Sequence, residues 1–372
     1  MNTLKSLSEY ALYNHGASML FIFWLIFSFL ILACTFLIVT IFSRLSKISD
    51  SRKSKKLKAV FELIILQMLE EPETALLKAE FEKSFKKKYL KNRFQKQLLV
   101  DELVAVHKGL EGELANSIQQ LFRKLKLDQY CLQKLGSSSW EVKAAGINEL
   151  REMQITEAMP LIAKMVLDKE FLVRGNAQLA LLELQNSRES ISFLKDLSYQ
   201  LSDWEQLRLH ESLKSRGNTK HDSFKTLYNS DNASVIIFGI RMSSYFGCHQ
   251  DIAALTLLST HHNEEIRFQS IKALRKLGDF EAESMLAQRF SSETIKVRIA
   301  ILDYLRGTGY NSLQLFLDAL TSSDHQLSLM AAFGLRGGYD PAFLSSLLAG
   351  LNLSEEVLLR LKHAEDPRLP AP

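Results

Sequence analysis

Turn-forming residues and cysteines are scarce in this chain of 372 residues. It contains only 16 Gly and 6 Pro, which favours long regular helices over short strands and turns. Its three cysteines, Cys34, Cys131 and Cys248, are far apart and form no CxxC pair. The sequence therefore contains neither a disulfide framework nor a zinc signature, and its cysteine usage is consistent with a reducing compartment.

Motifs of catalysis and cofactor binding are also missing. The sequence has no GxGxxG, Walker loop, HExxH or GxSxG, so dinucleotide, phosphate, zincin and hydrolase chemistry lack their local geometry. The nearest approach to a ligand cluster is the run from His261 to Glu265, which we expect in a turn where adjacent side chains diverge. The sequence thus predicts no catalytic residue, no metal ligand, no cofactor and a role that is not enzymatic.

One long stretch lacks charge altogether. Residues 19–42 contain no charged residue, Gly or Pro, and as a helix they would reach roughly 36 Å, against about 30 Å for the hydrocarbon core of a bilayer. The stretch is too long for the core of a signal peptide, no A-x-A site follows it, and basic residues come after it rather than before it. We predict a transmembrane helix over residues 19–42, with residues 1–18 on the extracytoplasmic side.

Basic residues follow the predicted span. From residue 44 to residue 96, 15 Lys and Arg outnumber 7 Asp and Glu, whereas residues 97–372 contain 30 against 34. The positive-inside rule then predicts a single-pass membrane protein with a cytoplasmic C-terminal domain. The basic residues nearest the span either contact anionic lipid, at about 1 kcal/mol each, or act only as a topology signal. They are Arg44, Lys47, Arg52, Lys53, Lys55, Lys56 and Lys58.

A helical repeat occupies the C-terminal two-thirds of the chain. An apolar anchor residue, usually followed by Arg or Lys, recurs about every 31 residues, with small or apolar residues four, seven and eight positions later. A polar turn able to cap a helix precedes each anchor, and an amphipathic segment precedes the turn, so each unit is predicted to be a helical hairpin. The anchors are Val142, Val173, Leu207, Val235, Ile266, Val297 and Leu327.

These repeats carry a resemblance to a known family. The text VRGNAQLAL from Val173, the polar turn before it and the Leu-Gly-Asp ending at residues 277–279 resemble the HEAT-repeat family, and more closely its short bacterial form, also named for phycobilisome lyases. The resemblance covers residues 137–350. It implies an all-α fold in which about seven HEAT-like hairpins form a right-handed α-solenoid. The unit that begins at Leu207 departs from the pattern, which leaves the repeat count open near residues 200–235.

Five segments are therefore expected. The order of a span, a basic helical region and short repeats is similar to that of membrane-anchored HEAT proteins of bacteria, and this resemblance implies the bacterial inner (cytoplasmic) membrane as the location. Residues 57–69 of the basic region have apolar residues at helical spacing, which we expect to pack on the next helix. The segments are the N-terminus (1–18), the transmembrane helix (19–42), a basic helical stalk with further helices (43–136), the repeats (137–350) and a C-terminal helix and tail (351–372).

Two features of the repeats have both a structural and a binding interpretation. Trp140 and Trp204 precede two anchors and are expected to pack between repeats rather than to stack on a ligand. Four arginines, one in each of four repeats, would either line the inner helices and meet acidic groups of a partner or pair with acids of the turns. These arginines are Arg174, Arg208, Arg267 and Arg298.

The sequence predicts a membrane-tethered scaffold or adaptor that binds a cytoplasmic or membrane protein. A surface-polysaccharide or envelope-assembly system is the setting that the family resemblance suggests. Two alternatives stay open. One is an enzyme like the lyases or DNA glycosylases built from HEAT-like repeats; the other is a binder of anionic lipid or nucleic acid through the basic stalk. A solvated helix face explains the basic runs of the stalk equally well, so the sequence alone does not favour nucleic acid.

Overall fold

The computed structural model describes residues 24–42, 54–67, 79–185, 191–215, 223–279, 281–308, 313–350 and 353–365. Every regular element in these ranges is a helix, either α or a short 3-10 turn. The prediction of an all-α chain is therefore confirmed. The chain divides into two compact units, unit 1 (Met1–Tyr130) and unit 2 (Cys131–Pro372).

The apolar stretch forms one continuous helix, Trp24–Phe42, with a mean hydropathy of 2.8. Among the described residues it is the one helix long and apolar enough to cross a membrane. Its three hydroxyls donate to backbone carbonyls of the same helix, Ser28 and Thr35 at 2.8 Å and Thr40 at 2.7 Å. These polar groups are therefore satisfied without water, as an apolar environment requires.

The remaining described part of unit 1 contains a helix at residues 54–67, α2 (Ala79–Tyr89), α3 (Arg93–His107), α4 (Gly112–Lys124) and the first residues of α5 (Leu127–Leu135). Phe61 is fully buried and contacts the rings of Phe85 and Tyr89 in α2, with centroid distances of 6.2 and 6.4 Å. The apolar stripe of residues 57–69 thus packs on the next helix at Phe61, as expected, while residues 68 and 69 lie outside the described ranges.

Unit 2 alternates long helices with shorter ones. The seven long helices are α6 (Trp140–Glu152), α8 (Phe171–Leu184), α9 (Asp203–Ser215), α11 (Ala233–Phe246), α13 (Glu264–Leu277), α15 (Ile295–Thr308) and α17 (His325–Gly338). The shorter ones are α7 (Met159–Ala163), α10 (Lys225–Tyr228), α12 (Ile252–Leu258), α14 (Glu283–Arg289) and α16 (Leu313–Leu320). Each of these five packs against the long helix that follows it. Helices α18 (Pro341–Ala349) and α19 (Glu355–Glu365) complete the unit.

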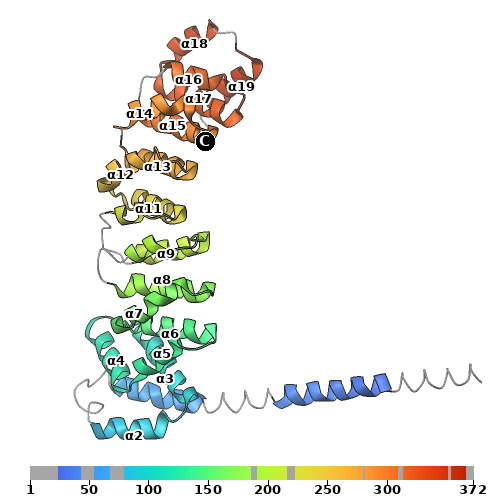
Figure 1. Ribbon diagram of the computed structural model, residues 1–372, viewed down its shortest axis with the longest axis vertical. Helices are drawn as coiled ribbons and strands as arrows, with labels where there is room; N and C mark the ends of the chain where they lie inside the picture. The colour runs from blue at the N-terminus through green and yellow to red at the C-terminus, as the bar shows by residue number, and fades with distance from the viewer. Residues whose placement is uncertain are drawn as a thin grey trace, which may run out of the picture. The chain divides into compact units, whose positions relative to one another are not determined.

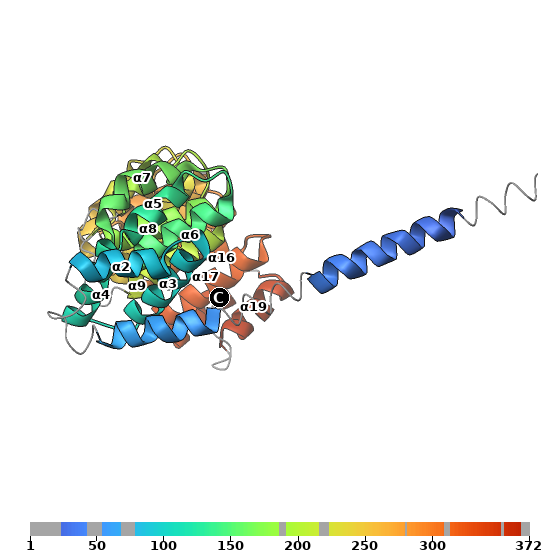
Figure 2. The same ribbon diagram turned by 90° about the horizontal axis from the view of Figure 1, so that it is seen from below.

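The long helices pack on one another in chain order. Helix α6 packs on α8 and α8 on α9; farther along, α11 packs on α13, α13 on α15 and α15 on α17. Helices α9 and α11 are joined by a hydrogen bond from Arg241 to Gln206 of 3.1 Å. Figure 1 shows the seven helices following one another from α6 to α17, and from below α6, α8 and α9 overlap, as successive layers of one stack do (Figure 2).

Side-chain contacts show that α13 and α15 run parallel, and Lys276 lies 5.7 Å from the centre of the Tyr245 ring, which brings the ends of α13 and α11 together in the same way. Near the start of α13 and α15, the Thr294 hydroxyl donates to Glu264 at 2.7 Å, and near their ends Arg275 Nε donates to the carbonyl oxygen of Asp303 at 3.1 Å. The residue numbers on the two helices rise together. Such parallel neighbours, about one repeat apart in sequence, place equivalent residues side by side.

The third residue of each long helix sets a common register. Five of the predicted anchors occupy this position and are at most 1 % exposed. They are Val173, Val235, Ile266, Val297 and Leu327. Val142 also stands at the third position of its helix, but its side chain is 39 % exposed. The polar turns act as predicted where Asn232, Asn263 and Asp324 accept backbone N–H groups of the first helical turn.

The anchor assigned to α9 was wrong by two residues. Leu207 is 49 % exposed, whereas Glu205, the third residue of α9, is 2 % exposed. The Glu205 carboxylate accepts the backbone N–H of Ser202 at 3.0 Å, and the Ser202 hydroxyl accepts the Glu205 N–H at 3.3 Å. This reciprocal capping box stabilises a buried Glu that no hydrophobic pattern could identify. With Glu205 as the anchor, the spacings from Val173 and to Val235 become 32 and 30 residues.

The two tryptophans are less completely buried than the expected packing between repeats implies. Trp140 and Trp204, in the first turns of α6 and α9, are 38 % and 55 % exposed.

A buried carboxylate fixes the irregular segment before α11. Asp251, fully buried ahead of α12, accepts hydrogen bonds from the Ser223 hydroxyl (2.5 Å), the Phe224 N–H (2.8 Å) and the Tyr228 hydroxyl (3.0 Å). Burial raises the pKa of Tyr228 above its usual range, so this hydroxyl keeps its proton and remains a donor. Asp251 thereby ties α10 and its preceding residues to α12.

We expect Asp251→Ala to destabilise the protein by about 3 kcal/mol, because three donors lose their acceptor inside the core. For a unit of this size the melting temperature should fall by roughly 6–12 °C, measured by circular dichroism on the full chain in detergent. Asp231→Ala, at an exposed residue nearby, is the matched control and should change the melting temperature little. Equal melting temperatures for the two variants would show that Asp251 does not hold this segment.

Candidate functional site: a basic groove

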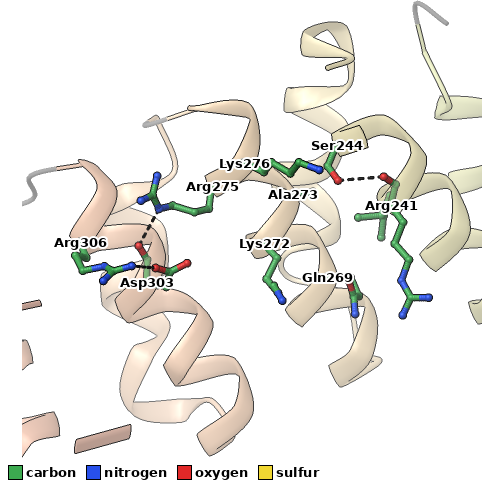
Figure 3. Close-up of a pocket in the computed structure, with 10 residues that line it drawn as sticks. Arg241, Ser244, Gln269, Lys272, Ala273, Arg275, Lys276, Asp303 and Arg306 are labelled. Atoms are coloured by element: carbon green, nitrogen blue, oxygen red, sulfur yellow. Dashed lines mark hydrogen bonds and ion pairs between the residues drawn. The ribbon is translucent and has the colours of Figure 1, made fainter. Parts of the chain in front are cut away.

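A groove of about 510 Å³ crosses α11, α13 and α15 in unit 2. Five cationic side chains line it, together with one carboxylate, that of Asp303 (Figure 3). We call it the basic groove; its cations are Arg241, Lys272, Arg275, Lys276 and Arg306. Residues 131–372 as a whole contain 26 Lys and Arg against 29 Asp and Glu. The positive charge of the groove is therefore a local feature of an otherwise acidic unit.

The common register of the long helices produces this groove. Arg241, Lys272 and Asp303 each stand six positions after the buried third residue of their helix, and Arg275 and Arg306 stand nine positions after it. Residues three apart share a helix face. Because neighbouring helices are parallel and packed helix axes are about 8–10 Å apart, these positions form rows across three helices.

A glycine makes room for one of the arginines. A Cβ atom on Gly307 would lie 2.1 Å from Cζ of Arg275, so only glycine lets this guanidinium lie across α15. Arg275 Nε donates to the carbonyl oxygen of Asp303 at 3.1 Å, and Arg306 Nη2 donates to the Asp303 carboxylate at 2.7 Å. A guanidinium has five N–H donors. These contacts orient both arginines and still leave donors for a ligand.

The two lysines of the groove lack a carboxylate partner among the described residues. Lys272 and Lys276 are exposed, and neither makes an ion pair within 4.0 Å in that part of the chain. Their nitrogens instead lie near aromatic rings, Lys272 at 5.3 Å from the centre of Phe268 and Lys276 at 5.7 Å from that of Tyr245. These uncompensated charges attract anions.

Three of the four arginines that the sequence offers either for a partner or for internal pairing contact the protein's own turns. Their guanidinium groups donate to carbonyl oxygens of the turn that precedes their helix, which compensates groups left free at a helix end. Arg174 reaches the carbonyls of residues 168 and 169 at 3.0 Å, Arg267 reaches those of residues 261 and 262 at 2.9 Å, and Arg298 reaches that of Ser291. Arg267 also pairs with Glu293 at 2.9 Å.

Arg208 occupies a different position from the other three. It lies three residues after the true anchor of α9, Glu205, and its Nη2 donates to Asn176 Oδ1 at 3.0 Å. A Cβ atom on Gly175 would stand 2.9 Å from Arg208 Nη1, so this arginine also lies against a glycine. Its contact with the neighbouring helix α8 is internal to unit 2.

Sequence reasoning missed the basic groove. The basic residues that the repeat pattern makes conspicuous stand directly after the anchors, and their side chains donate to carbonyl oxygens of the preceding turns. The signal that could have identified the groove lies six and nine positions after three consecutive anchors, Val235, Ile266 and Val297, where four of the six residues are Lys or Arg.

Other predicted residues are only partly described. Lys55 and Lys56 are exposed, whereas Lys58 pairs with Glu102 of α3, whose hydrogen bond raises the pKa of this lysine. Arg44, Lys47, Arg52 and Lys53 lie outside the described residues. In the run from His261 to Glu265, Asn263 caps α13, and within the described ranges no three His, Cys, Asp or Glu side chains are grouped to hold a metal.

Comparison with known proteins finds no matching family model and no matching curated protein. The HEAT resemblance therefore rests on the residues of this sequence.

Two glycine substitutions should distinguish a glycine that makes room for a groove side chain from one that is packed in the core. In Gly307→Ala the new Cβ meets the end of a flexible side chain, so Arg275 moves aside, and the better helix former adds up to about 1 kcal/mol of stability. In Gly334→Ala the Cβ would lie 2.2 Å from the buried Phe316 ring, and overpacking costs about 1–3 kcal/mol. Thermal unfolding should show a lower melting temperature only for Gly334→Ala. An equal loss in Gly307→Ala would mean that Arg275 is part of the core.

Proposed function

We propose that this protein is a membrane-tethered scaffold that binds another protein through a HEAT-like α-solenoid formed by unit 2. The observation that carries the proposal is the basic groove, which equivalent positions of three successive long helices build together. A stacked array of this kind offers an extended surface for partners. The partner is a cytoplasmic protein or the cytoplasmic part of another membrane protein.

The pairing of short and long helices supports the solenoid. Helices α7, α10, α12, α14 and α16 each pack on the long helix that follows, as the two helices of a hairpin do. The third residues of the seven long helices are 30–32 residues apart, the period of a short HEAT-like unit. About seven hairpins in a right-handed superhelix would fit this spacing.

The apolar helix near the N-terminus supports the proposed attachment to a membrane. Trp24–Phe42 has the length and hydropathy of a bilayer span. The excess of basic residues after it favours an inner-membrane protein whose units face the cytoplasm, and Lys55 and Lys56 are exposed as lipid contacts require. Tethering raises the local concentration of the scaffold at the membrane without any new contact to its partner.

The chemistry of the basic groove favours binding over catalysis. Its groups are guanidinium and ammonium cations and one carboxylate, Asp303, that is paired with Arg306 at 2.7 Å. Cations of this kind bind anions without proton transfer. We therefore favour the scaffold over the lyase-like and glycosylase-like alternatives.

The scaffold function can be tested by co-purification from solubilised membranes. The full chain is compared with a chain ending at Leu135, which retains the anchor, the basic stalk and the whole of α5. We expect a partner that is captured by the full chain and lost with the truncation, because the binding surface lies in the long helices of unit 2. Capture of the same proteins by both chains would place binding in the stalk instead.

The tether can be tested by protease treatment of spheroplasts that carry the chain with a C-terminal tag. We expect the tag to be protected until the membrane is lysed, and the chain to stay in the membrane pellet after carbonate extraction. A chain beginning at residue 44 is the control and should be released. Cleavage of the tag in intact spheroplasts would reverse the orientation, and a mature chain lacking residues 24–42 would identify a signal peptide.

A further inference from the structure

We infer that the basic groove binds an acidic, amphipathic segment of the partner protein, with the cations of α11, α13 and α15 holding successive carboxylates. The inference rests on the proposed function and specifies its ligand. It starts from an unusual distribution of charge, since five cations and one paired carboxylate line the groove within a unit whose net charge is negative.

The spacing of the cations matches a peptide. Arg241, Lys272 and the Asp303–Arg306 pair lie on successive parallel helices, whose axes are about 8–10 Å apart. Acidic residues seven positions apart on a helical peptide lie on one face about 10.5 Å apart, and those three positions apart on a polyproline II segment lie on one face about 9.3 Å apart. A segment lying across the three helices therefore presents one carboxylate to each.

The binding groups suit carboxylates. Arg275 and Arg306 are oriented by their contacts with Asp303, and the planar guanidinium can form two parallel hydrogen bonds to a carboxylate. Lys272 and Lys276 are exposed, with aromatic rings rather than carboxylates within reach in the described part of the chain. Their charges are available to a ligand at little desolvation cost.

Apolar contact is available beside the charges. The Tyr245 ring is 44 % exposed next to Lys276, and it packs edge to face on His210 with a centroid distance of 4.4 Å. An exposed aromatic ring held in this way favours a segment that carries an apolar residue between its acidic ones.

The surroundings of the groove favour a short peptide over a nucleic acid or a bilayer. Both of the latter are continuously charged and would extend beyond the groove. There they would meet a unit with 29 acidic and 26 basic residues, which repels a large polyanion. A short segment confined to the groove avoids this repulsion.

The test uses the full chain in nanodiscs of phosphatidylcholine. The probe is a fluorescein-labelled peptide of five Glu-Glu-Leu repeats, with a peptide of five Gln-Gln-Leu repeats as its uncharged counterpart, and binding is followed by fluorescence anisotropy. Competitors are a fifteen-nucleotide oligothymidylate and soluble dihexanoyl phosphatidylglycerol. We expect only the acidic peptide to bind, with an affinity that falls as salt is raised.

Charge reversal in the groove is compared with the same reversal elsewhere. The double variant Lys272→Glu/Lys276→Glu changes two exposed residues of the groove, and Lys164→Glu/Lys225→Glu changes two exposed residues outside it. We expect the groove variant to lower the affinity for the acidic peptide about tenfold or more, and the control to change it less than about twofold. The melting temperatures of both variants are measured in parallel to establish that each is folded.

The contrary outcomes are distinct. Equal binding of the two peptides, or equal losses in the two variants, would overturn the inference, as would stronger binding of the oligonucleotide or the lipid at the groove. Co-purification with the groove variant separates this inference from the proposed function. If the variant still captures the partner of the full chain, the groove is not the site but the scaffold function stands; if the full chain captures none, the scaffold function itself fails.

Discussion

Each long helix of unit 2 is stable only when its apolar face is covered by a neighbouring helix. A helix of 13 or 14 residues is marginal in water on its own, and its stability comes from packing of its apolar face. In this chain the partner is the next long helix, and the third residues, which are buried in every long helix except α6, fix the register at 30–32 residues. Parallel stacking of equivalent positions follows from this constraint. The same constraint places the exposed side chains of neighbouring helices in rows. The residue types in these rows differ from repeat to repeat, because burial does not restrict them.

Two sets of basic residues have different roles within this register. Arginines directly after the anchors, such as Arg174 and Arg267, reach back to carbonyl oxygens of the preceding turn, so their charges stabilise the connection between short and long helices. Cations six or nine positions after the anchors, such as Lys272 and Arg306, line the basic groove. The first set forms hydrogen bonds within the fold, whereas the second retains N–H donors that can bind a ligand. Packing and the groove meet at Gly307, because the absence of a side chain there lets Arg275 lie across the neighbouring helix.

The sequence predicted the helical class, the apolar helix and most of the repeat register, because these depend on apolar residues at regular spacing. It failed at α9, where Glu205 takes the buried position through a capping box with Ser202, a contact that hydropathy cannot indicate. It also predicted that Trp140 and Trp204 pack between repeats, although they are 38 % and 55 % exposed. The candidate site was missed because a surface row is defined by three helices together. Its residues have no pattern within one repeat and acquire one only when the register of neighbouring helices is known.

The parallel register is the central claim, and cross-linking between α13 and α15 tests it most directly. In a chain whose native cysteines are replaced by serine, a short bismaleimide is applied to the pair Glu265→Cys/Lys296→Cys, whose native side chains form an ion pair. The comparison pair, Glu265→Cys/Arg306→Cys, joins the same helices but is displaced by ten residues, about 15 Å along the axis. The account predicts rapid cross-linking of the first pair and none of the second. Cross-linking of the second pair alone would mean antiparallel helices, and equal cross-linking of both would contradict a fixed register, and with it the basic groove.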